Sequence, residues 1–498
     1  MCCNAGLSEL LMYRRSTPSI AVHSGSPADT MSSLGSVATT IMGGLPVTFA
    51  STFLFRSSSG IWNFTVEPLA YAIENVVATS NGSSEGNAGP ENTVNNSGLN
   101  ANDEHSAAAG DMWLATPGAD PLWIQYEFDR VYKLHEALIW NYNVQFELVL
   151  GFGLKDVTVE YSTDGVDWTA LGDVLFAQAT AAGSYTANTA VDLEGVAAKF
   201  VRLIVNSGHG VMGQSGLSEV RFTFIPVQAR KPQPADAETA VAVDAGLAWR
   251  AGREAAAHDV YLGTALDALA LTDTVGVGAY TPADLEFGTT YYWRIDEANE
   301  AETISVWEGN LWSFGTVEYA VIDDMESYDD EENAIYETWI DGWVNETGST
   351  VGYLEAPFAE RTIVNSGRQS MPLEYANDAA PFYSEAEYDL GSLDLAAHAA
   401  DTLRLFVIGQ VDNTPAPLYV ALEDTNGAVA VVPHPDTTIV TNSDWTEWLI
   451  PYNELNGIDL SRVATLYIGV GDRDNPSASG TGMIFIDDVG FGHPVTIE

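Results

Sequence analysis

An alternation of apolar and polar residues over 157–162 constrains the fold most. Val157, Val159 and Tyr161 alternate with polar side chains, which is the period-two pattern of a half-buried strand. Asp164-Gly165 follows, and this dipeptide accepts the positive φ angles of a tight hairpin turn. A second strand is predicted after it. The segment therefore belongs in a sheet with one covered face.

Segments of this kind recur along the whole chain. They are short, rich in β-branched and aromatic residues, and separated by clusters of Gly, Asn, Asp and Pro, and sustained helical periodicity is almost absent. Several short strands with regular turn signals indicate packed sheets. The sequence predicts an all-β protein built from β-sandwich domains.

The length of 498 residues corresponds to about three domains of ordinary size. We expect a leader over 1–60, domains over 61–227 and 228–317, and a last domain over 318–498. The segment VQARKPQPADAE at 227–238 contains two prolines, as expected of a linker at the first boundary.

The leader differs in composition from the rest. It holds Arg14, Arg15, many Ser and Thr, and an apolar run over 37–55 that Gly43, Gly44 and Pro46 interrupt. Such a segment is either a disordered or wrongly assigned start or an export signal. The interrupted run is barely long enough to cross a bilayer, so no membrane-spanning segment is predicted.

The first domain resembles the discoidin family, also called the coagulation factor 5/8 type C family. The resemblance rests on GLKDVTVEYSTDGVDWTALG at 153–172, preceded by WIQYEFD at 123–129 and followed by AKFVRLIV at 198–205 and GLSEVRFTF at 216–224. It implies a jelly-roll sandwich that binds glycans or lipid head groups and that rarely catalyses a reaction.

The second domain resembles a fibronectin type III sandwich. The segments LAWRA, HDVYLG, LEFGTTYYWRIDE and LWSFGT carry the resemblance. Trp249 and Tyr261 are predicted core residues. The run Gly-Thr-Thr-Tyr-Tyr-Trp suits a corner at which a Tyr hydroxyl bonds back to the chain. We expect this domain to act as a spacer.

The third domain begins VIDDMESYDDEE and ends GMIFIDDVGF, with strands such as DTLRLFVIG and VATLYIGVG between. It resembles the galactose-binding-like jelly-roll carbohydrate modules. The three domains together resemble the non-catalytic regions of secreted bacterial proteins of planctomycete type. The resemblance implies an extracellular or cell-surface location.

The charge balance limits the partners. The formal net charge is -50, from 69 acidic and 19 basic side chains. Such a surface repels nucleic acid and anionic membranes, which excludes a sequence-independent nucleic-acid binder. It suits a protein surrounded by salt or divalent cations. The only cysteines, Cys2 and Cys3, leave the domains without a disulfide and do not decide the redox compartment.

The resemblance of the first domain implies a structural calcium site. The matching loop spans 92–98, with Asn95 where the family usually has Asp and Glu219 as the carboxylate on the last strand. Calcium takes six to eight oxygen ligands, and Asn95 contributes less charge than Asp. The alternative is a hydrogen-bonded, Asn-rich turn.

A second calcium site is predicted in the third domain. Asp323, Asp324 and Glu326 lie near its start, whereas Asp487 and Asp488 lie near its end, and the terminal strands of a jelly roll are usually neighbours. Residues 318–394 hold 19 acidic and two basic side chains, a repulsion that a bound divalent ion offsets. The alternative is a solvated acidic face.

Sugar contacts in the first domain are predicted at its loops. Sugar C–H faces stack on aromatic rings, and sugar hydroxyls need side chains that donate and accept hydrogen bonds. The segment WNYNVQFE at 140–147 offers such side chains in one loop. The predicted contacts are Asn141, Tyr142, Asn143 and Phe146, with His209 and His105 added by family analogy. For any single residue, ordinary loop structure is the alternative.

Sugar contacts in the third domain are predicted on a sheet face. Trp339, Trp343, Tyr353, Arg368 and Arg473 are candidates for a stacking platform. The alternative for the tryptophans is burial in the core.

Catalytic motifs are missing from the sequence. It contains no G-x-S-x-G elbow, no Walker phosphate loop and no H-E-x-x-H motif, and its eight histidines are scattered without metal-site spacing. We therefore predict a secreted, calcium-stabilised protein that binds glycans or polysaccharide and is not an enzyme. The alternatives are a structural or adhesion protein that binds other proteins and a divergent polysaccharide-degrading enzyme. The sequence leaves the oligomeric state open.

Overall fold

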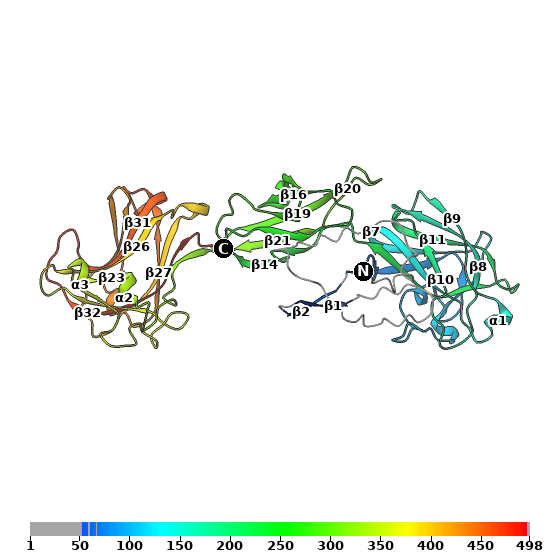
Figure 1. Cartoon of the computed structure of the whole chain (residues 1–498), viewed down its shortest axis with the longest axis horizontal. Helices are drawn as coiled ribbons and strands as arrows, with labels where there is room; N and C mark the ends of the chain where they lie inside the picture. The colour runs from blue at the N-terminus through cyan, green and yellow to red at the C-terminus, as the bar shows by residue number, and fades with distance from the viewer. Residues whose placement is uncertain (1–51, 58–59, 66, 496–498) are drawn as a thin grey trace, which may run out of the picture. The chain divides into compact units, whose positions relative to one another are not determined.

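β-Strands dominate the molecule, which confirms the all-β prediction (Figure 1). The computed structural model describes residues 52–57, 60–65 and 67–495. β1 (Thr52–Ser57) and β2 (Gly60–Thr65) pair as an antiparallel hairpin. The rest of the predicted leader lies outside the described residues. The chain divides into two compact units, up to Pro226 and from Val227 onward.

The first unit is a single sandwich. Its elements are β3 (Tyr71–Ala72), β4 (Val76–Ser80), β5 (Ser83–Ser84), η1 (Pro90–Thr93), η2 (Ala109–Asp111), β6 (Trp113–Thr116), β7 (Trp123–Asn141), α1 (Glu147–Leu150), β8 (Leu154–Ser162), β9 (Thr169–Leu175), β10 (Thr189–Asp192), β11 (Ala197–Gly208) and β12 (Ser215–Ile225).

The long strand β7 organises this unit. Its first half pairs with β4 and β11, whereas its second half pairs with β10 and β12. The strand order is β5-β6-β12-β7-β11-β8-β9. β7 is held by partner strands along its whole length. Its last residue, Asn141, therefore has a fixed position, and the loop that begins at residue 142 starts from there.

The alternation of β8 is confirmed, because Val157 and Val159 are buried in the core. The predicted tight turn is wrong. β8 ends at Ser162 and β9 begins at Thr169, so residues 163–168 form a longer connection. The Asp164 carboxylate accepts hydrogen bonds from the backbone N–H groups of Val166 and Asp167 at 2.8 and 2.9 Å, which closes this wider loop.

The second unit begins with two small sheets. The elements are β13 (Arg230–Gln233), β14 (Glu238–Val241), β15 (Leu247–Arg250), β16 (Ala257–Gly263), η3 (Leu266–Ala268), β17 (Ala270–Val275), β18 (Ala279–Tyr280), β19 (Thr290–Ala298), β20 (Val306–Trp307) and β21 (Leu311–Thr316). One sheet has the order β13-β15-β18 and the other β14-β21-β19-β16-β17, with β20 on β19.

Trp249 packs in the core between these sheets, as predicted. Tyr261 does not, because β16 turns Val260 inward and leaves Tyr261 half-buried under the Arg294 guanidinium, 4.6 Å from the ring centre. The predicted corner is present. The hydroxyl of Tyr291 accepts a hydrogen bond from the backbone N–H of Glu286 at 2.9 Å.

The second unit continues with a larger sandwich. Its elements are β22 (Tyr319–Asp323), α2 (Ile335–Thr338), β23 (Trp339–Ile340), α3 (Gly342–Asn345), β24 (Ser349–Val351), β25 (Met371–Ala376), β26 (Tyr383–Leu393), η4 (Ala397–Ala399), β27 (Thr402–Ile408), β28 (Leu418–Asp424), β29 (Val429–Pro433), η5 (Ile439–Thr441), β30 (Thr446–Pro451), η6 (Tyr452–Glu454), η7 (Leu460–Arg462), β31 (Val463–Gly471) and β32 (Thr481–Gly492).

Two sheets face each other across its core. One has the order β24-β25-β32-β27-β30, with β22 on β32, and the other β23-β26-β31-β28-β29 (Figure 1). The first and last strands are therefore neighbours, as predicted, with Asp323 opposite Val489. We call the face of the β23-β26-β31-β28-β29 sheet that points away from this core the outer face.

Phe287 joins the two parts of the second unit. Its buried ring belongs to the core of the larger sandwich and lies 5.8 Å from the Phe491 ring. The backbone N–H of Phe287 donates to the carbonyl of His398 at 3.1 Å. A loop of the smaller sandwich thus completes the core of the larger one, so the two parts share packing across residue 317.

Candidate functional site

Two loops form one end of the first unit, and we call residues 142–153 and 208–215 the loop end. Backbone hydrogen bonds tie the two loops together. The N–H groups of His209 and Gly210 donate to the carbonyls of Gly153 and Gly151 at 3.0 and 2.8 Å. Gly210 lies so close to the other loop that a Cβ there would meet the Leu150 carbonyl oxygen at 2.1 Å. The two loops are therefore joined directly to each other through their backbones.

Glu147 anchors the loop end from inside. Its carboxylate is buried and accepts hydrogen bonds from the N–H groups of Phe152 and Gly153, both at 2.9 Å. Burial raises the pKa of Glu147, although these backbone donors oppose the rise. Sequence reasoning missed this residue because its place at the end of a predicted sugar loop gave no sign of burial.

Asn141 is a structural residue in this conformation. Its amide nitrogen donates to the carbonyls of Leu154 and Ala177 at 2.7 and 2.9 Å, and its amide oxygen accepts from the N–H groups of Tyr142 and Leu154. The side chain is fully buried. The structure therefore does not support a direct sugar contact, because every donor and acceptor of the amide is used within the fold.

The same correction applies to three further predicted contacts. Tyr142 is buried against Phe152, with the ring centres 5.9 Å apart. Asn143 is buried and donates to the carbonyls of Ser106 and Ala182 at 3.1 and 2.7 Å. His105 is also buried, and burial lowers its pKa. All three support the loops from beneath.

Phe146 and His209 remain as predicted contacts that a ligand can reach. Phe146 is 63% exposed. His209 is half-buried, with Nε2 3.0 Å from the carbonyl oxygen of Phe176. This bond fixes the imidazole ring at the rim of the loop end.

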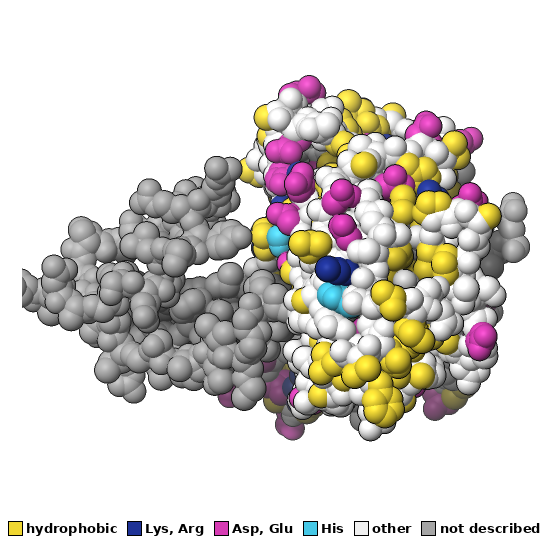
Figure 2. All heavy atoms as spheres, turned by 90° about the vertical axis from the view of Figure 1, so that its right-hand side faces the viewer, with side chains coloured by type: hydrophobic (Ala, Val, Ile, Leu, Met, Phe, Trp, Pro, Cys, Tyr) yellow, Lys and Arg dark blue, Asp and Glu magenta, His cyan; other side chains and the backbone are white. Residues whose placement is uncertain are grey.

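The loop end also exposes an apolar patch that the sequence analysis did not identify. Figure 2 looks toward this end of the first unit, where hydrophobic side chains gather on the surface. The patch consists of Phe146, Leu148, Val149, Val211 and Met212. Val211 and Met212 lie between two glycines. Flanking glycines indicate an exposed loop tip, so this pattern could have predicted their exposure.

Glu219 occupies the position predicted for a calcium ligand. It is buried, and its Oε2 has no hydrogen-bond partner among the described residues. Its Oε1 accepts only a long bond, 3.4 Å, from the N–H of Asn96. Burial raises the pKa of Glu219 to about 8. A buried carboxylate oxygen without a partner fits a cation ligand.

Asn95 fits this site less well. Its amide oxygen already accepts a hydrogen bond from the N–H of Ser97 at 2.8 Å, and its amide nitrogen lies 3.4 Å from the Asn92 oxygen. This is the Asn-rich turn that the sequence left as the alternative. Within the described residues, no group of three or more His, Cys, Asp or Glu side chains is arranged to hold a metal ion.

The carboxylate of Asp323, in the third domain, is used within the fold. One oxygen accepts from the N–H of Met325 at 2.8 Å, and the other accepts from Tyr328 Oη and from Trp339 Nε1. The carboxylate is thus used to hold core residues, and its predicted role as a metal ligand is not supported.

The other predicted carboxylates meet at the loop 365–369. Glu326 accepts from the backbone N–H groups of Arg368 and Gln369 at 2.6 and 3.0 Å. Asp488 accepts from Asn365 Nδ2 and Ser366 Oγ at 2.8 and 2.9 Å.

Asp487, next to this cluster, is buried, and burial raises its pKa to about 7. Asp324 is exposed, and its carboxylate accepts only from the N–H of Glu326, at 3.1 Å. The loop therefore gathers Glu326, Asp487 and Asp488 around its backbone and leaves Asp323 and Asp324 apart.

The predicted stacking platform is divided between core and surface. Trp339 is fully buried, so it cannot stack on a sugar. Tyr353 is half-buried and donates to Glu360, whereas Arg368 is exposed and pairs with Glu326 at 3.1 Å. Trp343 is 79% exposed and stays a prediction. Arg473 lies on the outer face, away from Arg368.

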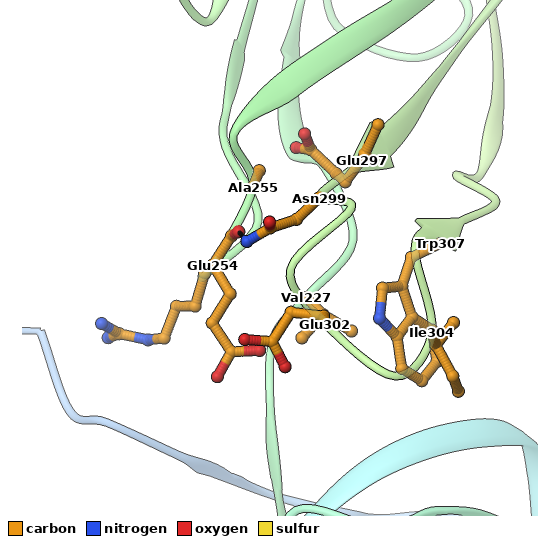
Figure 3. Close-up of a pocket in the computed structure, with 10 residues that line it drawn as sticks. Val227, Glu254, Ala255, Glu297, Asn299, Glu302, Ile304 and Trp307 are labelled. Atoms are coloured by element: carbon orange, nitrogen blue, oxygen red, sulfur yellow. Dashed lines mark hydrogen bonds between the residues drawn. The ribbon is translucent and has the colours of Figure 1, made fainter.

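A pocket in the smaller sandwich of the second unit is too small for a sugar. Figure 3 shows Trp307 and Ile304 beside Glu302, with Glu297 turned away. The cavity measures 10 Å³, which is room for about one water molecule. No helix in the described part of the chain is long and apolar enough to cross a membrane.

Comparison with known proteins places a family on part of the chain. Residues 75–220 match the model of the F5/8 type C domain. No curated protein sequence gave a match.

Solved structures of carbohydrate-binding modules show limited likeness. A module named CBM32-5 of Clostridium perfringens, in complex with GalNAc-β-1,3-galactose, is 14% identical, with 30% of this chain and 99% of that chain covered and a TM-score of 0.24. The family 32 module of NanJ from the same organism, in complex with galactose, is 13% identical, with coverages of 31% and 98% and a TM-score of 0.24. A family 11 module of Clostridium thermocellum, in complex with a β-1,3-1,4-mixed-linked tetrasaccharide, is 14% identical, with coverages of 36% and 98% and a TM-score of 0.22. Likeness at this level does not transfer a ligand.

Proposed function

We propose that the protein binds carbohydrate through the loop end of its first unit and does so without catalysis. The observation that carries the proposal is Phe146, an exposed aromatic ring on a loop that backbone hydrogen bonds join to the loop of His209. The match of residues 75–220 to the F5/8 type C model supports it.

The geometry suits a sugar for physical reasons. An aromatic ring stacks on the C–H face of a pyranose, and an imidazole nitrogen exchanges hydrogen bonds with sugar hydroxyls. Buried Asn141 and Glu147 hold the loop in place before the ligand arrives. Rigid loops lose little conformational entropy on binding, which favours affinity.

Calcium is part of the proposal as a structural ion. Glu219 would hold it in the first unit, together with oxygen atoms of the loop 92–98, because the unpartnered Glu219 Oε2 is a suitable ligand. In the second unit the carboxylates of Glu326 and Asp488 already accept hydrogen bonds from the loop 365–369, so the proposal places the ion at Glu219 alone. The ion would supply positive charge to this buried carboxylate and take no part in a reaction.

The remaining parts of the proposal concern location and mode of action. We infer an extracellular or cell-surface protein in which several domains bind weakly and gain avidity from being linked. The net charge of -50 favours neutral or cation-bridged polymers over polyanions.

Adhesion to another protein is the second candidate function. The apolar patch around Val211, which is 98% exposed, favours it, because clustered exposed apolar side chains mark interaction sites. In that case Leu148, Val149 and Met212 would contribute as much to binding as Phe146.

A glycan array with the full chain tests the proposal. We expect retention on a subset of neutral glycans, loss of retention in Phe146→Ala, and unchanged retention in the control Val166→Ala. Val166 is 78% exposed in the connection between β8 and β9. No retention on any glycan, combined with capture by a partner protein that Val211→Ser abolishes, would replace sugar binding by adhesion.

A further inference from the structure

The outer face of the larger sandwich carries an open pocket of 510 Å³. Val429 and Val431 of β29 form its apolar side, and Glu454, Asn456 and Arg473 form its polar side. The pocket is open to solvent, and Asp474 completes its polar side. It lies in the second unit, whereas the loop end belongs to the first.

The floor of this region is a rigid network of polar and aromatic side chains. Tyr419 is buried and its hydroxyl donates to Glu385 at 2.7 Å. The Arg473 guanidinium lies 4.6 Å from the centre of the Tyr467 ring, and the Tyr467 hydroxyl donates to Glu423 at 2.8 Å. Such a network fixes side chains before a ligand binds.

Negative charge exceeds positive charge on this face. The register places Glu385 opposite Gly469 and Glu387 opposite Tyr467, so both carboxylates lie on the same face two residues apart. Arg473 Nη1 lies 3.3 Å from Glu385 but off the hydrogen-bond direction.

Glu387 and Glu423 pair with no cation among the described residues. Burial, together with the charges of Glu385 and Glu423, raises the pKa of Glu387, although Arg473 opposes the rise. A cationic ligand group would relieve this repulsion.

We propose that this pocket is a second binding site, independent of the loop end, and that it takes a glycan carrying unsubstituted amino groups, such as a glucosamine oligomer. Glu387 and Glu423 adjoin the pocket along the sheet, because Glu423 lies opposite Val429 and Glu387 lies opposite Tyr467. An ammonium group of a ligand that extends past Val429 would lie between these two carboxylates. Arg473 and Asn456 would bond the hydroxyls, and Val429 and Val431 would contact the sugar C–H face. Uronate and sulfate groups are repelled by the same carboxylates.

The test compares matched ligands on the intact chain by titration calorimetry at pH 6. The ligands are a glucosamine hexamer, its fully N-acetylated counterpart and a uronic acid hexamer of equal length. We expect the glucosamine hexamer to bind several-fold more tightly than the acetylated one, with affinity that falls as salt rises, and the uronic acid hexamer not to bind. Equal affinity for the first two overturns the proposal without the need for any variant.

Charge-neutralising variants locate the site. Glu387→Gln and Glu423→Gln are each expected to weaken glucosamine binding by about threefold, the size of one partly exposed ion pair. Glu374→Gln, exposed on β25 of the other sheet, is the matched control and should change nothing. Unchanged binding in both Glu387→Gln and Glu423→Gln overturns the assignment.

Two further measurements complete the design. A lysine hexapeptide that binds as tightly as the glucosamine hexamer would show general attraction of cations and overturn the glycan assignment. Phe146→Ala should leave glucosamine binding intact. A loss of binding in that variant would place the glucosamine site at the loop end and contradict the second site.

Discussion

The loop end of the first unit and the outer face of the larger sandwich arrange the same residue types in opposite ways. At the loop end the polar residues Asn141 and Asn143 are buried and apolar side chains such as Phe146 project. On the outer face Tyr419 and Tyr467 are buried, and their hydroxyls donate to the carboxylates of Glu385 and Glu423.

This difference follows from the backbone. A loop leaving a sandwich must satisfy its own N–H and C=O groups, so it recruits nearby amides and carboxylates for this purpose. A regular sheet satisfies its backbone internally, so a side chain such as Glu387 is not needed for the backbone and remains available to a ligand. Residue type alone therefore does not tell which polar groups can bind.

The largest effect is expected for Asn141→Ala. Removal of the amide leaves buried backbone groups of Leu154, Ala177 and Tyr142 without partners, which costs about 3 kcal/mol of unfolding free energy. Urea denaturation of the full chain measures this loss of unfolding free energy, in the transition that belongs to the first unit. Asn206→Ala, an exposed control, should stay within about 0.5 kcal/mol. Equal stability of the two variants would show that the loop end does not depend on this amide.

The second-largest effect on the unfolding free energy is expected from calcium, which should stabilise the first unit. A ligand at one hundred times its Kd adds about 2.7 kcal/mol, and Glu219→Gln should remove most of this gain. Thermal unfolding with calcium and with chelator measures it. An equal gain in the wild type and in Glu219→Gln would place the ion elsewhere.

The pH dependence has a definite sign. The pKa of Glu219 is raised to about 8 in the folded protein, above about 4.3 in an unfolded chain. The folded state therefore binds more protons between these values, and without calcium the stability falls as the pH rises from about 4.5 to about 8. Calcium, which needs the ionised carboxylate, should stabilise more at pH 8 than at pH 5. A chelated protein whose stability rises over this window would contradict the assignment.

Phe146→Ala should weaken sugar binding by about tenfold, the size of a lost aromatic stacking contact. Its melting temperature should match that of the wild type because the ring is exposed. The smallest effect, about threefold, is expected for Glu387→Gln on the outer face. The first effect is measured with a neutral glycan and the second with the glucosamine hexamer. A loss of neutral-glycan affinity in Glu387→Gln as large as that in Phe146→Ala would show that the two sites are not independent.

Much of the scaffold was predictable from the sequence. The alternation at Val157 and Val159 identified a strand with one buried face, and the Tyr291 corner and the pairing of the terminal strands near Asp323 were also predicted correctly. The strand and the corner depend on local periodicity or on short sequence separations, whereas the pairing of the distant terminal strands was expected from the resemblance to a jelly roll. Tyr261 was assigned to the wrong face because a single residue in β16 decides which side chains point inward.

The candidate sites were less predictable. Asn141, Asn143 and His105 read as exposed loop residues, yet contacts with segments far away in the sequence, such as residue 177 for Asn141 and residue 182 for Asn143, bury them. Glu147 was missed for the same reason. Asp323 carried the right charge in the right strand, but its carboxylate points toward Tyr328 and Trp339. Direction and burial of a side chain depend on the assembled fold.

The most direct test of the central claim is the sugar affinity of the full chain measured for Phe146→Ala beside Tyr142→Phe. We expect loss of affinity in Phe146→Ala and wild-type affinity in Tyr142→Phe, because the exposed ring contacts the sugar and the buried tyrosine supports the loop. Wild-type affinity of Phe146→Ala, with loss in a folded Tyr142→Phe, would contradict it.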